Sequence, residues 1–322
     1  MLWTPMSSYR DDGHRAAVVV RSPGTAAGPR GRAPAVPRSP ERCDRVAREG
    51  KPMSHPNWTP DDVGEYYNAL TPASDVFLAG NEHHGYWYDD EDEAPIEEGS
   101  ARLTRKIVDT LGLRPGEHLL DAGCGAGAPA VLIADEYGVR VTGVTISSVG
   151  AQLAQARADA SGLSDRVRIE VGDYHALTHP ENHFDAVVAI ESLIHAVDLD
   201  RALREFYRVL RPGGRIAISE PTRLSPEVTM PSMYIREPAK AEDLLEAFVA
   251  AGFVLEEWVH CGRRVFGQSG RRFPKHAESL REEFVARFGE EAFLGLREAM
   301  KGLDPGPENM SYLILCARKP AG

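Results

Sequence analysis

The sequence predicts a doubly wound α/β fold, in which a mainly parallel sheet is covered by helices on both faces. Three observations predict it. After Pro115, short apolar runs alternate with amphipathic segments at intervals of about 10–15 residues, which is typical of βαβ units. The first apolar run ends in a glycine-rich loop that leads directly into a helix. The length of 322 residues and the apolar content of 42% allow a core of the necessary size.

The elements follow from this alternation in chain order. Before it begins, we expect a short helix over 61–67 and a longer one over 100–111. The alternation predicts strands over 118–122, 139–146, 167–171, 184–190 and 215–219, and helices over 128–137, 149–161 and 200–210. A turn over 211–214 precedes the last of these strands. Further on we expect a helix over 239–251, a strand over 254–260, a helix over 276–300 and a final strand over 312–317.

The first part of the chain differs in composition from the rest. Residues 1–52 are rich in Pro, Gly, Ala and Arg and show no apolar periodicity, so they cannot repay the entropy of ordering. Residues 1–51 hold ten Lys and Arg against five Asp and Glu, a net charge of +5 in a chain whose total is −11. We therefore predict a disordered basic extension over 1–52 and one domain over 53–322. Segments near 221–240 and 262–305, with the apolar residues Met230, Met233 and Tyr234, would form a lid.

Composition also excludes several classes of function. The body of the chain is acidic, whereas nucleic-acid binding draws its strength from Lys and Arg, so we expect no nucleic-acid partner. No apolar run approaches the ~20 residues of a membrane span, and none resembles a secretory core region, which predicts a cytoplasmic protein without membrane insertion. The four cysteines form no C-x-x-C pair, and Pro180 interrupts the regular spacing of His175, His179 and His183, so we expect no metal site. Homo-oligomer formation is left open.

The glycine-rich loop is the first candidate binding site. It contains Gly123, Gly125 and Gly127, which allow a tight turn and close approach of a ligand at the carboxyl edge of the sheet. Taken alone, the pattern from Gly123 to Ala128 also matches the fingerprint of a dinucleotide site. However, Asp121 would place a carboxylate beside a pyrophosphate, and the second strand ends without the acid that holds a nicotinamide ribose. A cationic ligand is the better complement, and a dehydrogenase is disfavoured.

Six motifs follow one another in order and at natural spacing. They are His83-x-Gly85-Tyr86-Trp87, Asp121-x-Gly-Cys-Gly-x-Gly127, Val141-Thr-Gly-Val-Thr-Ile-Ser147, Gly172-Asp173, Ala189-Ile-Glu-Ser-Leu-Ile-His195 and Arg208-Val-Leu-Arg-Pro-Gly-Gly214. With these motifs, roughly residues 61–318 resemble the class I S-adenosylmethionine-dependent methyltransferases. The similarity is greatest to small-molecule O-methyltransferases of natural-product pathways and to sterol and tocopherol methyltransferases. The resemblance implies a Rossmann-like sheet of seven strands whose last strand, over 312–317, is antiparallel.

The same resemblance implies S-adenosyl-L-methionine as the cofactor and a set of residues that bind it. Asp121 would lie near the methionine ammonium, Asp173 would accept from the adenine amino group, and Tyr86 with Trp87 would close over the sulfonium. Relatives usually carry glutamine at the position of Gly150, so that ribose contact is either missing here or taken over by Gln152. The complete predicted set is Tyr86, Trp87, Asp121, Gly123, Gly125, Gly127, Thr145, Ile146, Gln152, Asp173, Tyr174 and Ile190.

The predicted catalytic residues follow the fourth and fifth strands. Because the cofactor supplies the reactive methyl group, the protein must align donor and acceptor and manage one proton. A histidine with a pKa near ~6.5 is suited to that task, so we assign His195 as the general base. Glu191 would orient His195 or bind substrate, and Glu220 corresponds to an acid that similar O-methyltransferases carry after the fifth strand.

The predicted function is methyl transfer to a small, largely apolar secondary metabolite, such as one of antibiotic biosynthesis, with oxygen as the preferred acceptor atom. One alternative is C-methylation of an alkene or prenyl group, with Glu191 stabilising a carbocation. N-methylation is another alternative. A protein that binds the cofactor without transferring its methyl group, as a cyclase or scaffold, remains a third, because a fold does not dictate chemistry.

Overall fold

The computed structural model describes residues 58–225, 237–302, 306 and 308–322. The chain divides into two units, Met1–Lys51 and Pro52–Gly322, and the described residues all belong to the second. The predicted basic extension over 1–52 and the predicted lid residues Met230, Met233 and Tyr234 lie outside the described residues. Within them, no helix is long and apolar enough to cross a membrane.

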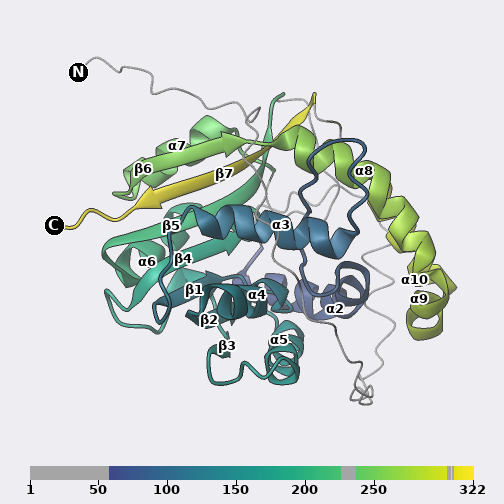
Figure 1. Cartoon of the computed structure of the whole chain (residues 1–322), viewed down its shortest axis with the longest axis horizontal. Helices are drawn as coiled ribbons and strands as arrows, with labels where there is room; N and C mark the ends of the chain where they lie inside the picture. Colours follow the sequence, from purple (N-terminus) through teal and green to yellow (C-terminus); the bar gives the residue numbers. More distant parts are fainter. Residues whose placement is uncertain (1–57, 226–236, 303–305, 307) are drawn as a thin grey trace. The chain divides into compact units, whose positions relative to one another are not determined.

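A seven-stranded sheet with the order β3-β2-β1-β4-β5-β7-β6 forms the centre of this unit (Figure 1). Its strands are β1 (His118–Ala122), β2 (Arg140–Thr145), β3 (Val167–Val171), β4 (Phe184–Ile190), β5 (Leu210–Arg223), β6 (Val254–His260) and β7 (Met310–Arg318). Strands β1 to β5 pair in parallel, whereas β7 runs antiparallel to both of its neighbours, β5 and β6. The predicted fold class and the antiparallel last strand are therefore confirmed.

Helices cover both faces of the sheet. The α-helices of the described residues are α2 (Pro60–Leu78), α3 (Ile96–Asp109), α4 (Ala128–Tyr137), α5 (Ser148–Ala160), α6 (Leu199–Val209), α7 (Ala241–Ala250), α8 (Gly262–Ser279), α9 (Arg281–Phe288) and α10 (Glu290–Gly302). Neighbouring strand residues face opposite sides, because side chains alternate along a strand. Leu119 of β1 packs in one core cluster with α3, α4 and α8, whereas Leu120 packs in another with α6 and α7. The sheet therefore lies between two layers of helices, with one apolar core on each of its faces.

The bounds of several predicted elements differ in the structure, and three of the differences are large. Helix α2 continues to Leu78, although Pro72 lies inside it and cannot donate a backbone hydrogen bond. The single helix predicted over 276–300 is instead the end of α8 followed by α9 and α10, and Gly289 with φ +89° follows the end of α9. The turn predicted over 211–214 is included in β5, whose pairing with β4 shifts register between Phe184 and Ala186.

The strand order reverses between β1 and β4, which creates a crevice at the carboxyl edge of the sheet. The loops after these two strands come together there. A Cβ atom on Gly123 would lie only 2.5 Å from the Cβ of Ser192, so glycine is required where the loop after β1 meets the loop after β4. Ser192 Oγ also donates to the carbonyl of Ala122 at 2.6 Å. The first glycine of the loop thus positions both walls of the crevice.

Gly127 has a packing role that can be tested by substitution. Its φ is +84°, and a Cβ atom there would lie 2.5 Å from the Cβ of Ala154 on α5. Gly116 has a similar φ of +86°, but a Cβ atom added there would have no neighbouring atom within 4 Å. We expect Gly116→Ala to lower the free energy of unfolding by about 1–2 kcal/mol through backbone strain alone. Gly127→Ala should cost about 1–3 kcal/mol more because it also overpacks the contact between α4 and α5. Urea unfolding of both variants measures the difference, and equal losses would contradict the packing role.

Candidate functional site

A cleft opens at the carboxyl edge of the sheet, where the crevice between the loops after β1 and β4 lies. It encloses about 840 Å³, counting its open mouth. Ten residues predicted from the sequence line it together: Asp121, Gly123, Gly125, Thr145, Ile146, Asp173, Tyr174, Ile190, Glu191 and His195. They come from the ends of the first four strands, as expected for a parallel sheet in which these ends share one edge.

Asp121 has the chemistry of a cation-binding residue. Its side chain is 2% exposed, and Oδ2 has no hydrogen-bond partner among the described residues. Burial raises the pKa of its carboxyl group to about 7. A buried carboxylate without a partner is costly, and a bound cation with hydrogen-bond donors would remove that cost. The cleft therefore fits a ligand that brings an ammonium group to Asp121.

Asp173 and Tyr174 line the part of the cleft after β3. Oδ1 of Asp173 accepts two hydrogen bonds from His175, one from its backbone N–H at 2.9 Å and one from its ring Nδ1 at 2.6 Å. Burial alone would raise the pKa of Asp173, but these hydrogen bonds and the His175 charge lower it. The Tyr174 hydroxyl donates to the Ser192 carbonyl at 2.9 Å and joins the loops after β3 and β4. A charged carboxylate therefore stands at the position predicted to bind an adenine amino group.

Helix α2 covers the cleft, a role that the sequence did not predict. Pro60, Val63, Tyr67 and Thr71 follow at helical spacing and all line the cleft. Asn68, on the same helix, accepts hydrogen bonds from Ser147 Oγ at 2.9 Å and from the Val149 N–H at 3.1 Å. These contacts fix α2 to the N-terminus of α5 next to the end of β2. No motif marks the segment, because its cleft residues are common helix residues that become neighbours of the strand ends only in the fold.

His195 and Tyr67 form a polar pair in the cleft. The Tyr67 hydroxyl lies 2.7 Å from Nε2 of His195, and the two rings meet edge to face at 5.2 Å. Burial lowers the pKa of His195 to about 4, and the nearby charge of Glu191 opposes that shift. The imidazole is therefore neutral at pH 7, and a neutral imidazole has one nitrogen that accepts a proton. Tyr67 is a site residue that sequence reasoning missed.

Glu191 lines the cleft, but its carboxylate is held by other groups. Oε1 accepts from the His84 backbone N–H at 2.8 Å and from the Tyr312 hydroxyl at 2.7 Å, and Oε2 pairs with Nδ1 of His84 at 2.9 Å. Burial alone would raise the pKa of Glu191, but the charge and hydrogen bonds of His84 outweigh it and keep the pKa below the usual range. Its backbone has φ +49°, a strained conformation for glutamate. Glu191 is thus a buried, compensated anion beside His195.

Glu220 does not line the cleft. It is buried in β5, and its carboxylate accepts the backbone N–H groups of Leu193 at 2.7 Å and Ile194 at 3.2 Å. These two residues belong to η2 (Leu193–His195), the short turn that carries His195. The geometry therefore gives Glu220 a positioning role for this turn and no contact with the space of the cleft.

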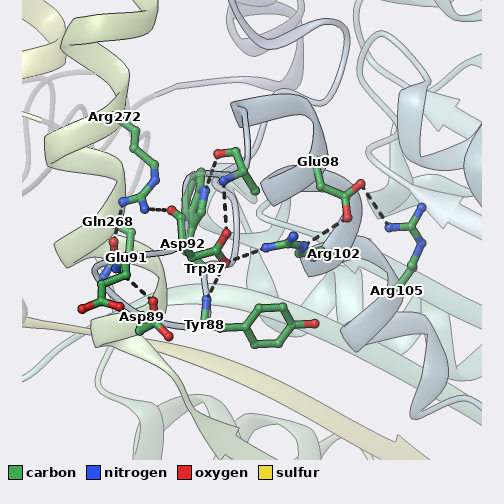
Figure 2. Close-up of polar contacts among 11 residues, drawn as sticks. Trp87, Tyr88, Asp89, Glu91, Asp92, Glu98, Arg102, Arg105, Gln268 and Arg272 are labelled. Carbon is green, nitrogen blue, oxygen red and sulfur yellow. Dashed lines mark hydrogen bonds and ion pairs between the residues drawn. The ribbon is translucent and has the colours of Figure 1, made fainter. Parts of the chain in front are cut away.

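Tyr86 and Trp87 also lie away from the cleft. Both are buried, and Lys106 lies over the Tyr86 ring at 4.6 Å. The Trp87 indole N–H donates to the Ala94 carbonyl at 3.0 Å. Figure 2 shows Trp87 between Arg102 of α3 and Arg272 of α8, beside residues of the acidic loop over 89–93. In this structure, the two aromatic rings fasten the loop to α3 and α8, and they do not close over a ligand in the cleft.

Two further predicted residues do not line the cleft. Gly127 packs against Ala154, as described above. Gln152 lies on the exposed side of α5, so the ribose contact considered for it has no support from its position. Among the described residues, no group of His, Cys, Asp and Glu side chains has the geometry to hold a metal ion.

Comparison with known proteins places this geometry in a family. A family model described as a methyltransferase domain matches residues 120–218. The chain is 42% identical over 162 residues to 27-O-demethylrifamycin SV methyltransferase of Amycolatopsis mediterranei. The aligned residues cover 50% of this chain and 59% of that protein. It is 35% identical to O-methyltransferase cnsE of Penicillium expansum, covering 62% of this chain and 74% of that protein. The chain thus spans about three fifths of the length of the first of these relatives.

A solved structure extends the similarity over nearly a whole chain. The crystal structure of the [4+2]-cyclase SpnF superposes with a TM-score of 0.73 at 33% identity, covering 82% of this chain and 97% of the other. S-adenosylmethionine is the cofactor that these comparisons indicate. The glycine loop, the buried Asp121 carboxylate and the charged Asp173 fit it. The chain belongs to the class I S-adenosylmethionine-dependent methyltransferases.

Proposed function

We propose that this protein transfers a methyl group from S-adenosylmethionine to an oxygen atom of a small, largely apolar secondary metabolite. The observation that carries the proposal is the neutral imidazole of His195 in the same cleft as the cofactor residues Asp121 and Asp173. The cofactor supplies an electrophilic methyl group when it is bound, so the protein needs a base and a means of orienting the acceptor. O-methyltransferases among the relatives support oxygen as the acceptor.

The proton of the acceptor hydroxyl passes to His195 in this proposal. The Tyr67 hydroxyl contacts Nε2 of the neutral ring at 2.7 Å, and this contact fixes the plane of the imidazole. An acceptor hydroxyl that reaches Nε2 takes the place of the phenol. The Glu220 carboxylate fixes the turn that carries His195 by accepting hydrogen bonds from two of its backbone N–H groups. The negative charge of Glu191 stabilises the imidazolium that forms. Val63 and Pro60 supply apolar surface from α2 for the body of the acceptor.

The contacts of Glu191 favour oxygen over carbon as the site of methylation. A carboxylate that stabilises a carbocation must be able to face it, but both oxygens of Glu191 are engaged by His84 and Tyr312. The C-methyltransferase alternative therefore ranks below O-methylation. A second candidate function is cyclisation without methyl transfer, which is favoured by the extensive similarity to the cyclase SpnF.

One experiment separates these possibilities. The purified protein is incubated with S-adenosylmethionine and with 27-O-demethylrifamycin SV or a panel of apolar alcohols and phenols, and the products are analysed by mass spectrometry. A mass gain of about 14 Da, which replaces a hydrogen by a methyl group, with a methoxyl carbon signal supports O-methylation. A methyl group on carbon or nitrogen overturns the choice of atom. Conversion of an acceptor without a mass gain supports a cyclase and overturns methyl transfer.

A further inference from the structure

Glu82 is a second carboxylate in the cleft, and none of the roles described above uses it. It lines the cleft on the segment between α2 and the His83–Trp87 motif. Its carboxylate lies directly against Gly125 of the glycine loop, where it would collide with any Cβ atom. Ser74 of α2 donates to its Oε1 at 2.8 Å. Gly125 thus leaves room for a carboxylate that α2 holds against the loop.

Two carboxylates, those of Glu82 and Asp121, line this cleft without an ion-pair partner among the described residues. Asp121 lies two residues before Gly123, the first glycine of the loop, and Glu82 lies against its second glycine, Gly125. The charges of both carboxylates add to the burial that raises the pKa of the Cys124 thiol in this loop. No Lys, Arg or His side chain in the described part of the chain forms an ion pair with either of them. Oδ2 of Asp121 is buried and without a hydrogen-bond partner there. This arrangement suits a ligand that brings positive charge and N–H donors.

The backbone of Glu82 adds an independent observation. Its φ of +51° lies in the left-handed region, which costs free energy for a residue other than glycine. A strained backbone conformation persists only where neighbouring contacts hold it in place, and such positions cluster at functional sites. At Glu82 this backbone conformation is found together with a carboxylate that lies against the glycine loop and accepts a hydrogen bond from Ser74.

We propose that the Glu82 carboxylate binds the ammonium group of the cofactor's methionine part together with Asp121. The sulfonium is the other cationic centre of the cofactor, but it loses its charge during methyl transfer. A carboxylate beside the sulfonium would stabilise the bound cofactor more than the transition state and would slow the reaction. The ammonium keeps its charge throughout, so a carboxylate there strengthens binding without that penalty. This inference rests on the cofactor and is independent of the acceptor.

The test measures the affinity of three probes for the wild-type protein and for Glu82→Gln by calorimetry. S-adenosylmethionine carries both cationic centres, S-adenosylhomocysteine only the ammonium, and 5′-methylthioadenosine neither. We expect Glu82→Gln to weaken the first two about tenfold, the size of one charge-assisted hydrogen bond, and to leave the third within twofold. An effect on S-adenosylmethionine alone would move Glu82 to the sulfonium. No effect, or an equal effect on all three probes, would also overturn the proposal.

Two further variants keep the test decisive. Ser74→Ala removes the hydrogen bond to Glu82 but keeps the charge, so it should change the affinities less than threefold; a loss as large as that of Glu82→Gln would assign the effect to loop geometry. If Glu82→Gln does not fold, Glu82→Asp retains the charge on a shorter side chain and should give a smaller loss confined to the two probes that carry the ammonium. A wild-type protein that binds none of the probes would instead contradict the proposed function.

Discussion

Asp121→Asn is expected to weaken the binding of S-adenosylmethionine about 10- to 100-fold. The substitution keeps the shape of the side chain but removes the charge that we propose pairs with the ammonium, and a hydrogen bond to a charged group contributes about 1.5–3 kcal/mol. Oδ2 of Asp121 has no partner in the described structure that could compensate. Calorimetric titration measures the effect. Asp159→Asn, at the exposed end of α5, is the matched control and should bind within twofold of the wild-type protein.

The affinity of the wild-type protein should also depend on pH. Burial raises the pKa of Asp121 to about 7, so the carboxyl group is increasingly protonated as the pH falls below 7. A protonated carboxyl group cannot pair with an ammonium, and the affinity should therefore fall by up to tenfold per pH unit below about 7 and level off above it. The slope should be smaller in Asp121→Asn. A wild-type affinity that does not change between pH 5.5 and 8 would argue against Asp121 as the ammonium partner.

His195→Ala is expected to lower turnover roughly 10²-fold or more while leaving the affinity for S-adenosylmethionine unchanged. The reason is that general bases contribute about 10²- to 10⁴-fold, and His195 is assigned to the proton of the acceptor and not to the cofactor. Single-turnover kinetics with the acceptor identified by the mass-spectrometric screen measures the rate. His183→Ala removes a histidine outside the cleft and should retain wild-type turnover. Wild-type turnover in His195→Ala would assign the base elsewhere.

The pH dependence of the reaction rate distinguishes the role of His195 from that of Asp121. Burial lowers the pKa of His195 to about 4, so the imidazole is neutral and able to accept a proton at every pH well above 4. Turnover at saturating cofactor should therefore hold from pH 8 down to about pH 5 and decline only near pH 4, because protonation removes the base. At low cofactor concentration the rate should already decline below pH 7, where Asp121 is protonated. A decline in saturated turnover centred near pH 6.5 would contradict a buried His195.

Most of the sheet could be predicted from the sequence because its strands are buried on both faces. Apolar runs such as 118–122 and 184–190 coincide with β1 and β4, since a strand enclosed by two helical layers needs apolar residues throughout. The end of α2 could not be predicted in the same way. Pro72 signals a break, yet the helix continues through it, supported by contacts such as that of Asp75 with Arg157 of α5 at 2.8 Å. Tertiary contacts override the local signal there.

Some residues of the candidate site could likewise be predicted from the sequence, and others could not. Residues at strand ends, such as Asp121 and Asp173, could be predicted because the topology of a parallel sheet gathers them at one edge. Tyr67 and Glu82 could not, because they reach the cleft on a helix and a segment whose path over the sheet depends on packing. The aromatic pair Tyr86 and Trp87 shows the reverse case. Its motif carried an implied binding role, but in this structure the rings pack under Arg272 and Lys106 outside the cleft.

The network around Glu191 also bears on how the protein matures during synthesis. Its members, His84, Glu191 and Tyr312, lie near the beginning, the middle and the end of the domain. Tyr312 belongs to β7, which inserts between β5 and β6 and follows both of them in the chain. A nascent chain can therefore assemble the first five strands while the carboxylate beside His195 still lacks one of its donors. The carboxylate beside His195 therefore gains its full set of donors only after β7 has been synthesised and inserted, and chains truncated before β7 should expose the edge of β5.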